Sequence, residues 1–158
     1  MRLLFFELKN YAGITNGMNL ETISIDFSKC KNTITLICGM NGVGKSTLLK
    51  AMNPLPDSSD NYSLGMEAHK KMTISDNGSI FEIYIVSPVN SSMTRTQTRA
   101  YIKKNGVELN DTGNITSYKD IIFNEFELDA NYISLSKLSS DDRGLATKIP
   151  SERKKYIA

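Results

Sequence analysis

A glycine-rich segment at residues 39–47, GMNGVGKST, constrains this chain more than any other feature. Its spacing is G-x-x-x-x-G-K-[ST], the pattern of a loop whose backbone N–H groups surround a phosphate. The run before it, Thr33 to Cys38, is short, apolar and β-branched, which predicts a buried strand. The run after it, Lys45 to Met52, has good helix formers and no breaker. A strand, a glycine turn and a helix form the arrangement that a phosphate-binding loop needs.

Each part of this motif has a chemical task. Gly42 and Gly44 have no Cβ, so the backbone can adopt positive φ and fold closely around an anion. The Lys45 ammonium would lie between the β- and γ-phosphates of a nucleotide, and Thr47 could donate to the α-phosphate. The Ser46 hydroxyl would be a ligand of Mg²⁺, which prefers oxygen donors. The predicted site residues are Gly39, Asn41, Gly42, Val43, Gly44, Lys45, Ser46 and Thr47, with Ser46 as the metal ligand. A strand–helix turn with an exposed lysine is the alternative.

Composition narrows the class of protein. The chain has 158 residues, enough for one domain, and is 40% hydrophobic and 23% charged, as ordinary globular proteins are. Its formal net charge of +2 argues neither for nor against nucleic-acid binding. No apolar run approaches the ~20 residues of a membrane span, and the N-terminal apolar run is too short for a signal peptide. We therefore expect a cytoplasmic protein that is not associated with a membrane. Cys30 and Cys38 would be free thiols, with Cys38 on the buried strand, and the lone His69 would be structural or on the surface.

The rest of the chain predicts strands and hairpins around the loop. Two strands should precede it, at Arg2 to Leu8 and Thr22 to Phe27, with a turn-rich segment from Asn10 to Gly17 between them. Pro54 and Pro56 should end the helix after the loop, and Asp57 to Glu67 should be a polar loop. An antiparallel meander should follow, with one hairpin (71–75 and 80–86) around Asp76-Asn77-Gly78 and another (94–103 and 107–109) around Asn105-Gly106.

The last part of the sequence, from residue 117 on, predicts a helix, a strand and a second helix that has no C-terminal cap by residue 158. Ser117 to Phe126 should be helical, with Ser117 as N-cap and one apolar face formed by Tyr118, Ile121, Ile122 and Phe126. A short strand at 132–135, a polar loop at 136–148 and a helix from Ser151 should follow. No apolar strand ends in the carboxylate that P-loop hydrolases use to hold Mg²⁺. Either the site is completed elsewhere or the chain is a fragment.

Three segments resemble a known family. Leu8-Lys9-Asn10-Tyr11, Ile25-Asp26-Phe27 and residues 34–50 (ITLICGMNGVGKSTLLK) are similar to the N-terminal lobe of an SMC-like ABC ATPase head. The branch they resemble is the large subunit of recombination and double-strand-break repair nucleases, including SbcC and its bacteriophage relatives. Residues 150–155 (PSERKK) resemble the P-x-E-R-[RK] element that leads into the coiled coil there. The resemblance covers nearly the whole chain.

The resemblance implies a fold, cofactors and partners. The fold would be α/β, a P-loop NTPase of the ABC/SMC-head type, whose N-terminal lobe has a mixed sheet and an antiparallel β-meander. Residues 1–158 would be one ATPase lobe, a fragment of a longer chain that continues into a coiled coil. ATP and Mg²⁺ would be the cofactors, and a second head, a nuclease subunit and DNA would be the partners. The full assembly would hydrolyse ATP. The isolated chain would bind ATP without significant turnover, because the acidic strand, the catalytic glutamate and the signature motif belong to a C-terminal lobe.

One departure and two alternatives stay open. The family usually has a glutamine after the strand that here is 132–135, whereas the only glutamine of this chain is Gln97. Ser136, Ser139 or Asp141 could substitute for it. The alternatives are a transporter-type ABC nucleotide-binding domain, which should show its signature before residue 158, and a small self-contained P-loop kinase or GTPase, which should continue with parallel β-α units.

Two basic groups could contact DNA phosphate or be ordinary solvated surface. The first is Arg153-Lys154-Lys155, for which we favour a solvated helix face. The second comprises Arg95, Arg99, Lys103 and Lys104, whose spacing on a strand does not place all four on one face.

Overall fold

An antiparallel sheet organises the part of the chain that the computed structural model describes, residues 1–30 and 35–128. Within these ranges the sheet has six strands in the order β2-β1-β3-β4-β5-β6. The strands are β1 (Arg2–Lys9), β2 (Thr22–Asp26), β3 (Ala68–Asp76), β4 (Ser79–Ser87), β5 (Arg99–Lys104) and β6 (Val107–Glu108). The helices are α1 (Ala12–Met18), α2 (Lys45–Ala51) and α3 (Ile115–Glu125), with a 3₁₀ turn η1 (Ser59–Asn61).

Local turn chemistry explains the two hairpins, which the sequence predicted. Asn77 and Gly78 have φ values of 46° and 78°, and Asn105 and Gly106 have 50° and 82°. Two successive residues with positive φ make the tight turn whose twist matches that of the flanking strands. The first hairpin pairs β3 with β4 from Ala68↔Ser87 to Asp76↔Ser79. The second is shorter than predicted, because β5 begins at residue 99 and β6 ends at residue 108.

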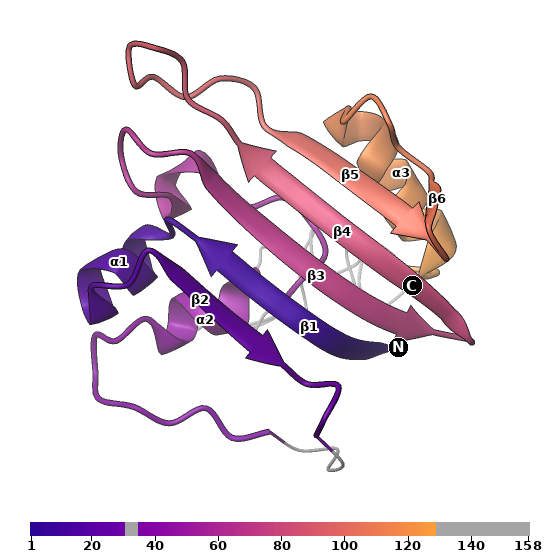
Figure 1. Cartoon of the computed structure of the whole chain (residues 1–158), viewed down its shortest axis with the longest axis horizontal. Coiled ribbons are helices and arrows are strands. Elements are labelled where there is room, and N and C mark those ends of the chain that lie inside the picture. Colours follow the sequence, from indigo (N-terminus) through magenta and orange to yellow (C-terminus); the bar gives the residue numbers. More distant parts are fainter. Residues whose placement is uncertain (31–34, 129–158) are drawn as a thin grey trace, which may run out of the picture.

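The two faces of the sheet have different surroundings. Side chains of one face form the core with residues from the helices; its buried members include Phe6, Met72, Phe81, Ile83, Ile102, Leu48, Tyr118 and Ile122. Figure 1 shows α2 and α3 behind the sheet, with no described helix crossing its front. The described helices therefore cover the sheet on one side only. The alternation of buried and partly exposed residues along β3 and β4 follows from this arrangement.

The structure corrects three predictions about the chain around the loop. Residues 12–18 form a helix and not turns; Asn19, at φ 53°, closes it by donating its N–H to Thr15 O. Residues 35–38 form no strand, and Cys38 is exposed rather than buried. Within the described ranges no strand pairs with this segment, and an extended segment without a neighbour has no ladder of hydrogen bonds to hold it. The fold contains helices and strands, and is α/β as predicted. The predicted mixed sheet is wrong for the described strands, because each pair of them is antiparallel.

Other predictions about the described residues are confirmed, and some lie outside them. The strands before the loop, the helix after it and the polar segment before β3 are present. Cys30 and Cys38 are free thiols. None of the helices in residues 1–30 and 35–128 is long and apolar enough to cross a membrane. The predicted strand at 132–135, the loop at 136–148 and the helix from Ser151 lie outside the described residues.

Helix α3 begins two residues earlier than predicted, and Asn114 caps it. The Asn114 Oδ1 accepts hydrogen bonds from the backbone N–H groups of Thr116 (2.8 Å) and Ser117 (3.1 Å). A side-chain oxygen at this position satisfies N–H groups that have no partner within the helix. The predicted cap, Ser117, lies inside the first turn and is exposed. The predicted apolar face is present, because Tyr118 and Ile122 are buried.

We expect Asn114→Ala to lower the free energy of unfolding by about 1 kcal/mol, the usual cost of losing an N-cap. Ser117→Ala is the matched control and should change it by less than about 0.5 kcal/mol, as most surface substitutions do. Urea denaturation followed by circular dichroism measures both. A larger loss for Ser117→Ala than for Asn114→Ala would show that the cap is misassigned.

Candidate phosphate-binding site

The glycine-rich segment forms a loop that ends at the N-terminus of α2. Gly42 and Gly44 have φ values of 87° and 85°, the left-handed region that favours glycine. Gly44 is the N-cap residue of α2, and the first helical hydrogen bond runs from Leu48 N to Gly44 O at 2.9 Å. Since glycine has no side chain to cap the helix, the N–H groups of its first turn keep their capacity to bind an anion.

Lys45 folds back over this loop. Its Nζ donates hydrogen bonds to Gly39 O at 2.7 Å and Met40 O at 2.6 Å. Two backbone carbonyls at the start of the loop thus hold the ammonium, although Lys45 is the first residue of α2. A phosphate oxygen could replace either carbonyl as acceptor, and the positive charge would favour that exchange. Ser46 and Asn41 are exposed, and Thr47 is half-buried.

Helix α1 packs closely against the loop, a feature that the sequence reasoning missed. A Cβ at Gly17 would lie 2.2 Å from Gly42 O, and one at Gly13 would lie 2.0 Å from the Thr47 hydroxyl oxygen. A Cβ at Gly44 would lie 2.6 Å from Gly13 O. Side chains four residues apart share one face of a helix, so Gly13 and Gly17 present a flat surface to the loop. The four-residue spacing of Gly13 and Gly17 was the sequence signal for a helix with a glycine face. Because two glycines in a short segment also indicate turns, the sequence predicted turns there.

The residues present fit a phosphate better than they fit a complete metal site. The loop offers positive-φ glycines, a helix N-terminus and an ammonium, all of which suit an anion. Ser46 offers one exposed hydroxyl for Mg²⁺, which commonly takes few protein ligands together with phosphate oxygens and waters. In residues 1–30 and 35–128, no three His, Cys, Asp or Glu side chains are grouped so that they could hold a metal ion. Ser46 therefore fits Mg²⁺ as a single ligand beside a bound phosphate.

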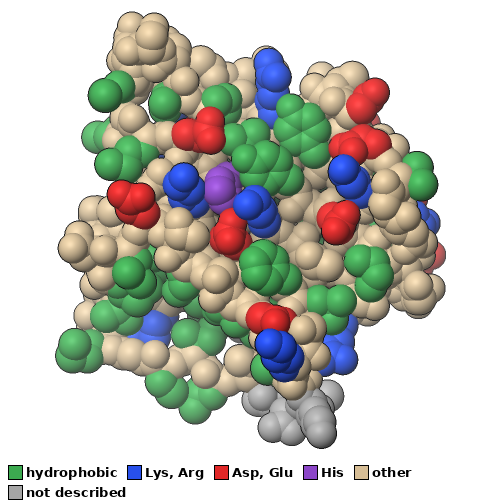
Figure 2. All heavy atoms as spheres, in the orientation of Figure 1, with side chains coloured by type: hydrophobic (Ala, Val, Ile, Leu, Met, Phe, Trp, Pro, Cys, Tyr) green, Lys and Arg blue, Asp and Glu red, His purple; other side chains and the backbone are tan. Residues whose placement is uncertain are grey.

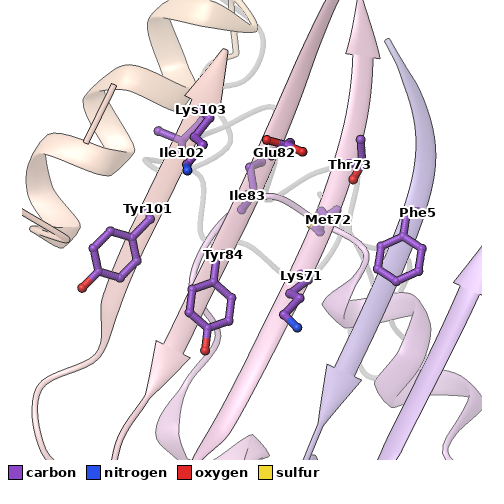
Figure 3. Close-up of a pocket in the computed structure, with 10 residues that line it drawn as sticks. All are labelled: Phe5, Lys71, Met72, Thr73, Glu82, Ile83, Tyr84, Tyr101, Ile102 and Lys103. Carbon is purple, nitrogen blue, oxygen red and sulfur yellow. The ribbon is translucent and has the colours of Figure 1, made fainter. Parts of the chain in front are cut away.

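A second surface of interest is the face of the sheet that no described helix covers, which we call the bare face. Figure 2 shows basic, acidic and hydrophobic side chains interspersed over it. A shallow cavity of about 250 Å³ lies on this face, and Figure 3 shows the rings of Tyr101, Tyr84 and Phe5 spread over β5, β4 and β1. The two tyrosine rings are nearly parallel, with centroids 6.3 Å apart. Lys71 and Lys103 lie among them, but Glu7 and Glu108 pair with these lysines at 3.1 and 3.2 Å, so the face has no strong positive field.

The second predicted basic group is split between surfaces. Arg99 and Lys103 alternate on β5 with the buried Ala100 and Ile102, and Lys103 lines the cavity on the bare face. Lys104 instead pairs with Glu125 of α3 at 2.6 Å. The group therefore offers no continuous patch, as its spacing indicated. The first basic group, residues 153–155, lies outside the described residues.

His69 is a structural residue rather than a ligand. Its Nε2 lies 2.9 Å from the Glu7 carboxylate, and its ring lies 5.5 Å from that of Tyr84. Partial burial alone would raise the pKa of Glu7, but hydrogen bonds from His69 and Lys71 outweigh it and hold that pKa below its ordinary value. The group links β1 to β3.

No protein-family model matches this chain, and no curated protein matches its sequence. The geometry of the loop is therefore the basis on which a function can be inferred.

Proposed function

We propose that this chain is the ATP-binding portion of a DNA repair or recombination ATPase of the SMC-like, nuclease-associated kind. The observation that carries the proposal is the loop itself. Two glycines at positive φ lead into α2, and the Lys45 ammonium donates hydrogen bonds to the Gly39 and Met40 carbonyls. This arrangement suits the β- and γ-phosphates of a nucleoside triphosphate, since it combines backbone donors, a helix N-terminus and a mobile point charge. Gly39, Asn41 and Val43 complete the loop.

Mg²⁺ belongs to the same proposal. Ser46, at the second position of α2, would hold the ion through its exposed hydroxyl. When bound, Mg²⁺ neutralises charge on the β- and γ-phosphates. Lys45 supplies a second positive charge from the protein, and Thr47, the third residue of α2, packs against Gly13 of α1.

The site as described is incomplete, which supports a fragment of a larger ATPase. Residues 36–38 are apolar, yet Leu36 is 83% exposed and the segment pairs with no described strand. An apolar run with the composition of a strand but no strand neighbour within residues 1–30 and 35–128 suits an ATPase lobe whose remaining strands come from elsewhere. In the proposed assembly a C-terminal lobe supplies those strands, the acidic Mg²⁺ ligand and the catalytic glutamate. Ser136, Ser139 and Asp141, the candidate substitutes for the missing glutamine, lie outside the described residues.

The proposed partners are those that the resemblance to the SMC-like family implies. They are a second ATPase head that closes over ATP, a nuclease subunit, and DNA, in a cytoplasmic assembly. The two alternatives, a transporter domain and a small kinase or GTPase, fit less well. After α2 the chain enters antiparallel hairpins, whereas a small kinase or GTPase continues with parallel β-α units.

The isolated chain should bind ATP but hydrolyse it negligibly. Lys45 and Ser46 can hold phosphates, but neither orients a water nor closes the site from the far side, and phosphoryl transfer depends on such positioning. Phosphate release from the purified chain, measured beside equilibrium binding of a fluorescent ATP analogue, checks both halves of this expectation.

Two outcomes of that experiment would discriminate between the candidate functions. Turnover of about 1 s⁻¹ or more by the isolated chain, within the range of ordinary enzymes, and lost in Lys45→Ala, would favour the small self-contained enzyme. Activity that appears only when a separate C-terminal lobe is added would support the divided ATPase head.

A further inference from the structure

Among the described residues one lysine is completely buried, at a position where an apolar side chain would be expected. Lys70 lies on the core face of β3, in alternation with the buried Ala68 and Met72, and its side chain has no exposed surface. Charged groups are seldom buried unless hydrogen bonds and an opposite charge compensate them. The contacts of Lys70 therefore indicate what the charge does there.

Lys70 holds the C-terminal end of α2. Its Nζ donates to the backbone carbonyls of Ala51 (3.2 Å), Asn53 (3.0 Å) and Leu55 (2.7 Å). Ala51 is the last residue of α2, whose C-cap, Met52, is not in the left-handed conformation that usually satisfies terminal carbonyls. A positive charge at this end also complements the helix dipole. Lys70 thus replaces a C-terminal cap and ties α2 to the sheet.

The same lysine is linked to α1 through Asp57. Lys70 Nζ lies 2.8 Å from the Asp57 carboxylate, which also accepts a 2.7 Å hydrogen bond from the Tyr11 hydroxyl. Burial, together with the Asp57 charge, raises the pKa of Tyr11, so its hydroxyl stays a donor. Tyr11 is the N-cap residue of α1, and its carbonyl accepts hydrogen bonds from Ile14 N and Thr15 N. We call Lys70, Asp57 and Tyr11 the Lys70 network.

This network contacts both elements that shape the phosphate-binding loop. α2 has only seven residues, about 10 Å of helix at 1.5 Å per residue, so a tilt at its C-terminus displaces its N-terminus as well. α1 touches the loop through Gly13 and Gly17, where the space is too small for a Cβ. A displacement of either helix would therefore be transmitted directly to Gly42 and Gly44.

We infer that Lys70 is a positioning residue for the phosphate-binding loop: it fixes α2 directly and α1 through Asp57 and Tyr11, and thereby sets the affinity for ATP. This inference rests on the proposed function. It gives a role to Lys70, which lies more than twenty positions after the motif and acts on the loop through α1 and α2.

The test is Lys70→Met, which keeps an unbranched side chain but removes the charge and the donors. We expect the dissociation constant for ATP, measured by calorimetry at a temperature where the variant is folded, to rise about tenfold or more, as small displacements of a binding group can cause. The amide resonances of Gly42 and Gly44 should shift in the ¹H–¹⁵N spectrum. Lys104→Met is the matched control: it also removes a lysine paired with a carboxylate, here Glu125 of α3, and should leave the dissociation constant and both resonances unchanged.

A second variant covers the case in which Lys70→Met does not fold. Lys70→Met combined with Asp57→Asn removes both charges of the Lys70–Asp57 pair, and the same rise in the dissociation constant is expected. If either folded variant binds ATP within twofold of wild type, with the two glycine resonances unmoved, Lys70 only stabilises the fold and the inference is overturned. If wild type itself fails to bind ATP, the proposed function is what fails.

Discussion

ATP with Mg²⁺ should raise the melting temperature of this chain by roughly 5–10 °C when the free ligand is near a hundred times its dissociation constant. Binding to the folded state alone at that concentration contributes ~2.7 kcal/mol, and for a chain of this size each kcal/mol corresponds to about 2–4 °C. Lys45→Ala should abolish most of the gain. The ammonium that now bonds to the Gly39 and Met40 carbonyls is the charge best placed to meet the β- and γ-phosphates.

The same helix offers a control for this thermal-shift experiment. Lys50 lies in the last turn of α2 and is exposed, so Lys50→Ala removes an equal charge without touching the loop. It should keep the full gain. Equal gains for wild type and Lys45→Ala would contradict the assignment of the phosphate site, and so would the absence of any gain in wild type.

Alanine should be far less tolerated at Gly44 than at Gly42, although both have nearly the same φ. An L-residue in this left-handed conformation costs roughly 1–2 kcal/mol at either position. A Cβ at Gly42 would meet nothing within 4 Å, whereas one at Gly44 would lie 2.6 Å from Gly13 O and 2.8 Å from Ile14 Cδ1. Overpacking of this kind typically adds about 1–3 kcal/mol. Gly44→Ala should therefore lose more stability and, because α1 and the loop must separate, most of the ATP affinity.

Urea denaturation and ATP calorimetry on the two glycine variants measure these effects. The comparison isolates the contact with α1, since the backbone strain is common to both. Gly78→Ala, in the β3–β4 turn at φ 78° with open space around it, gives the cost of strain alone far from the site. If Gly42→Ala and Gly44→Ala behaved alike, the close packing of α1 against the loop would be wrong.

Much of the local structure could be predicted from the sequence because its causes are local. Asn77-Gly78 and Asn105-Gly106 form the expected turns, since their preference for positive φ belongs to the residues themselves. The helix after the glycine loop begins at Lys45, and the prolines that follow end it. The motif spacing likewise placed the eight candidate loop residues together without any knowledge of the rest of the chain.

Other features depend on contacts that span many residues. The helix at 12–18 forms although Gly13 and Gly17 have low intrinsic helix propensity, because those glycines allow a close approach to the loop some thirty residues later. The segment at 35–38 has the composition of a buried strand, yet a strand exists only where a neighbour pairs with it, and the described residues supply none.

The sequence by itself determined the chemistry of the loop: the glycines, the lysine and the hydroxyls that could receive a nucleotide and its metal ion. Only the tertiary structure decided what surrounds and supports them. Lys70 shows the difference most directly, because lysine side chains are seldom buried and no motif in the sequence marks this one. Its burial becomes favourable only when the Asp57 carboxylate and three carbonyls at and just after the C-terminal end of α2 converge on it. Such convergence depends on the fold as a whole, since no local propensity encodes it.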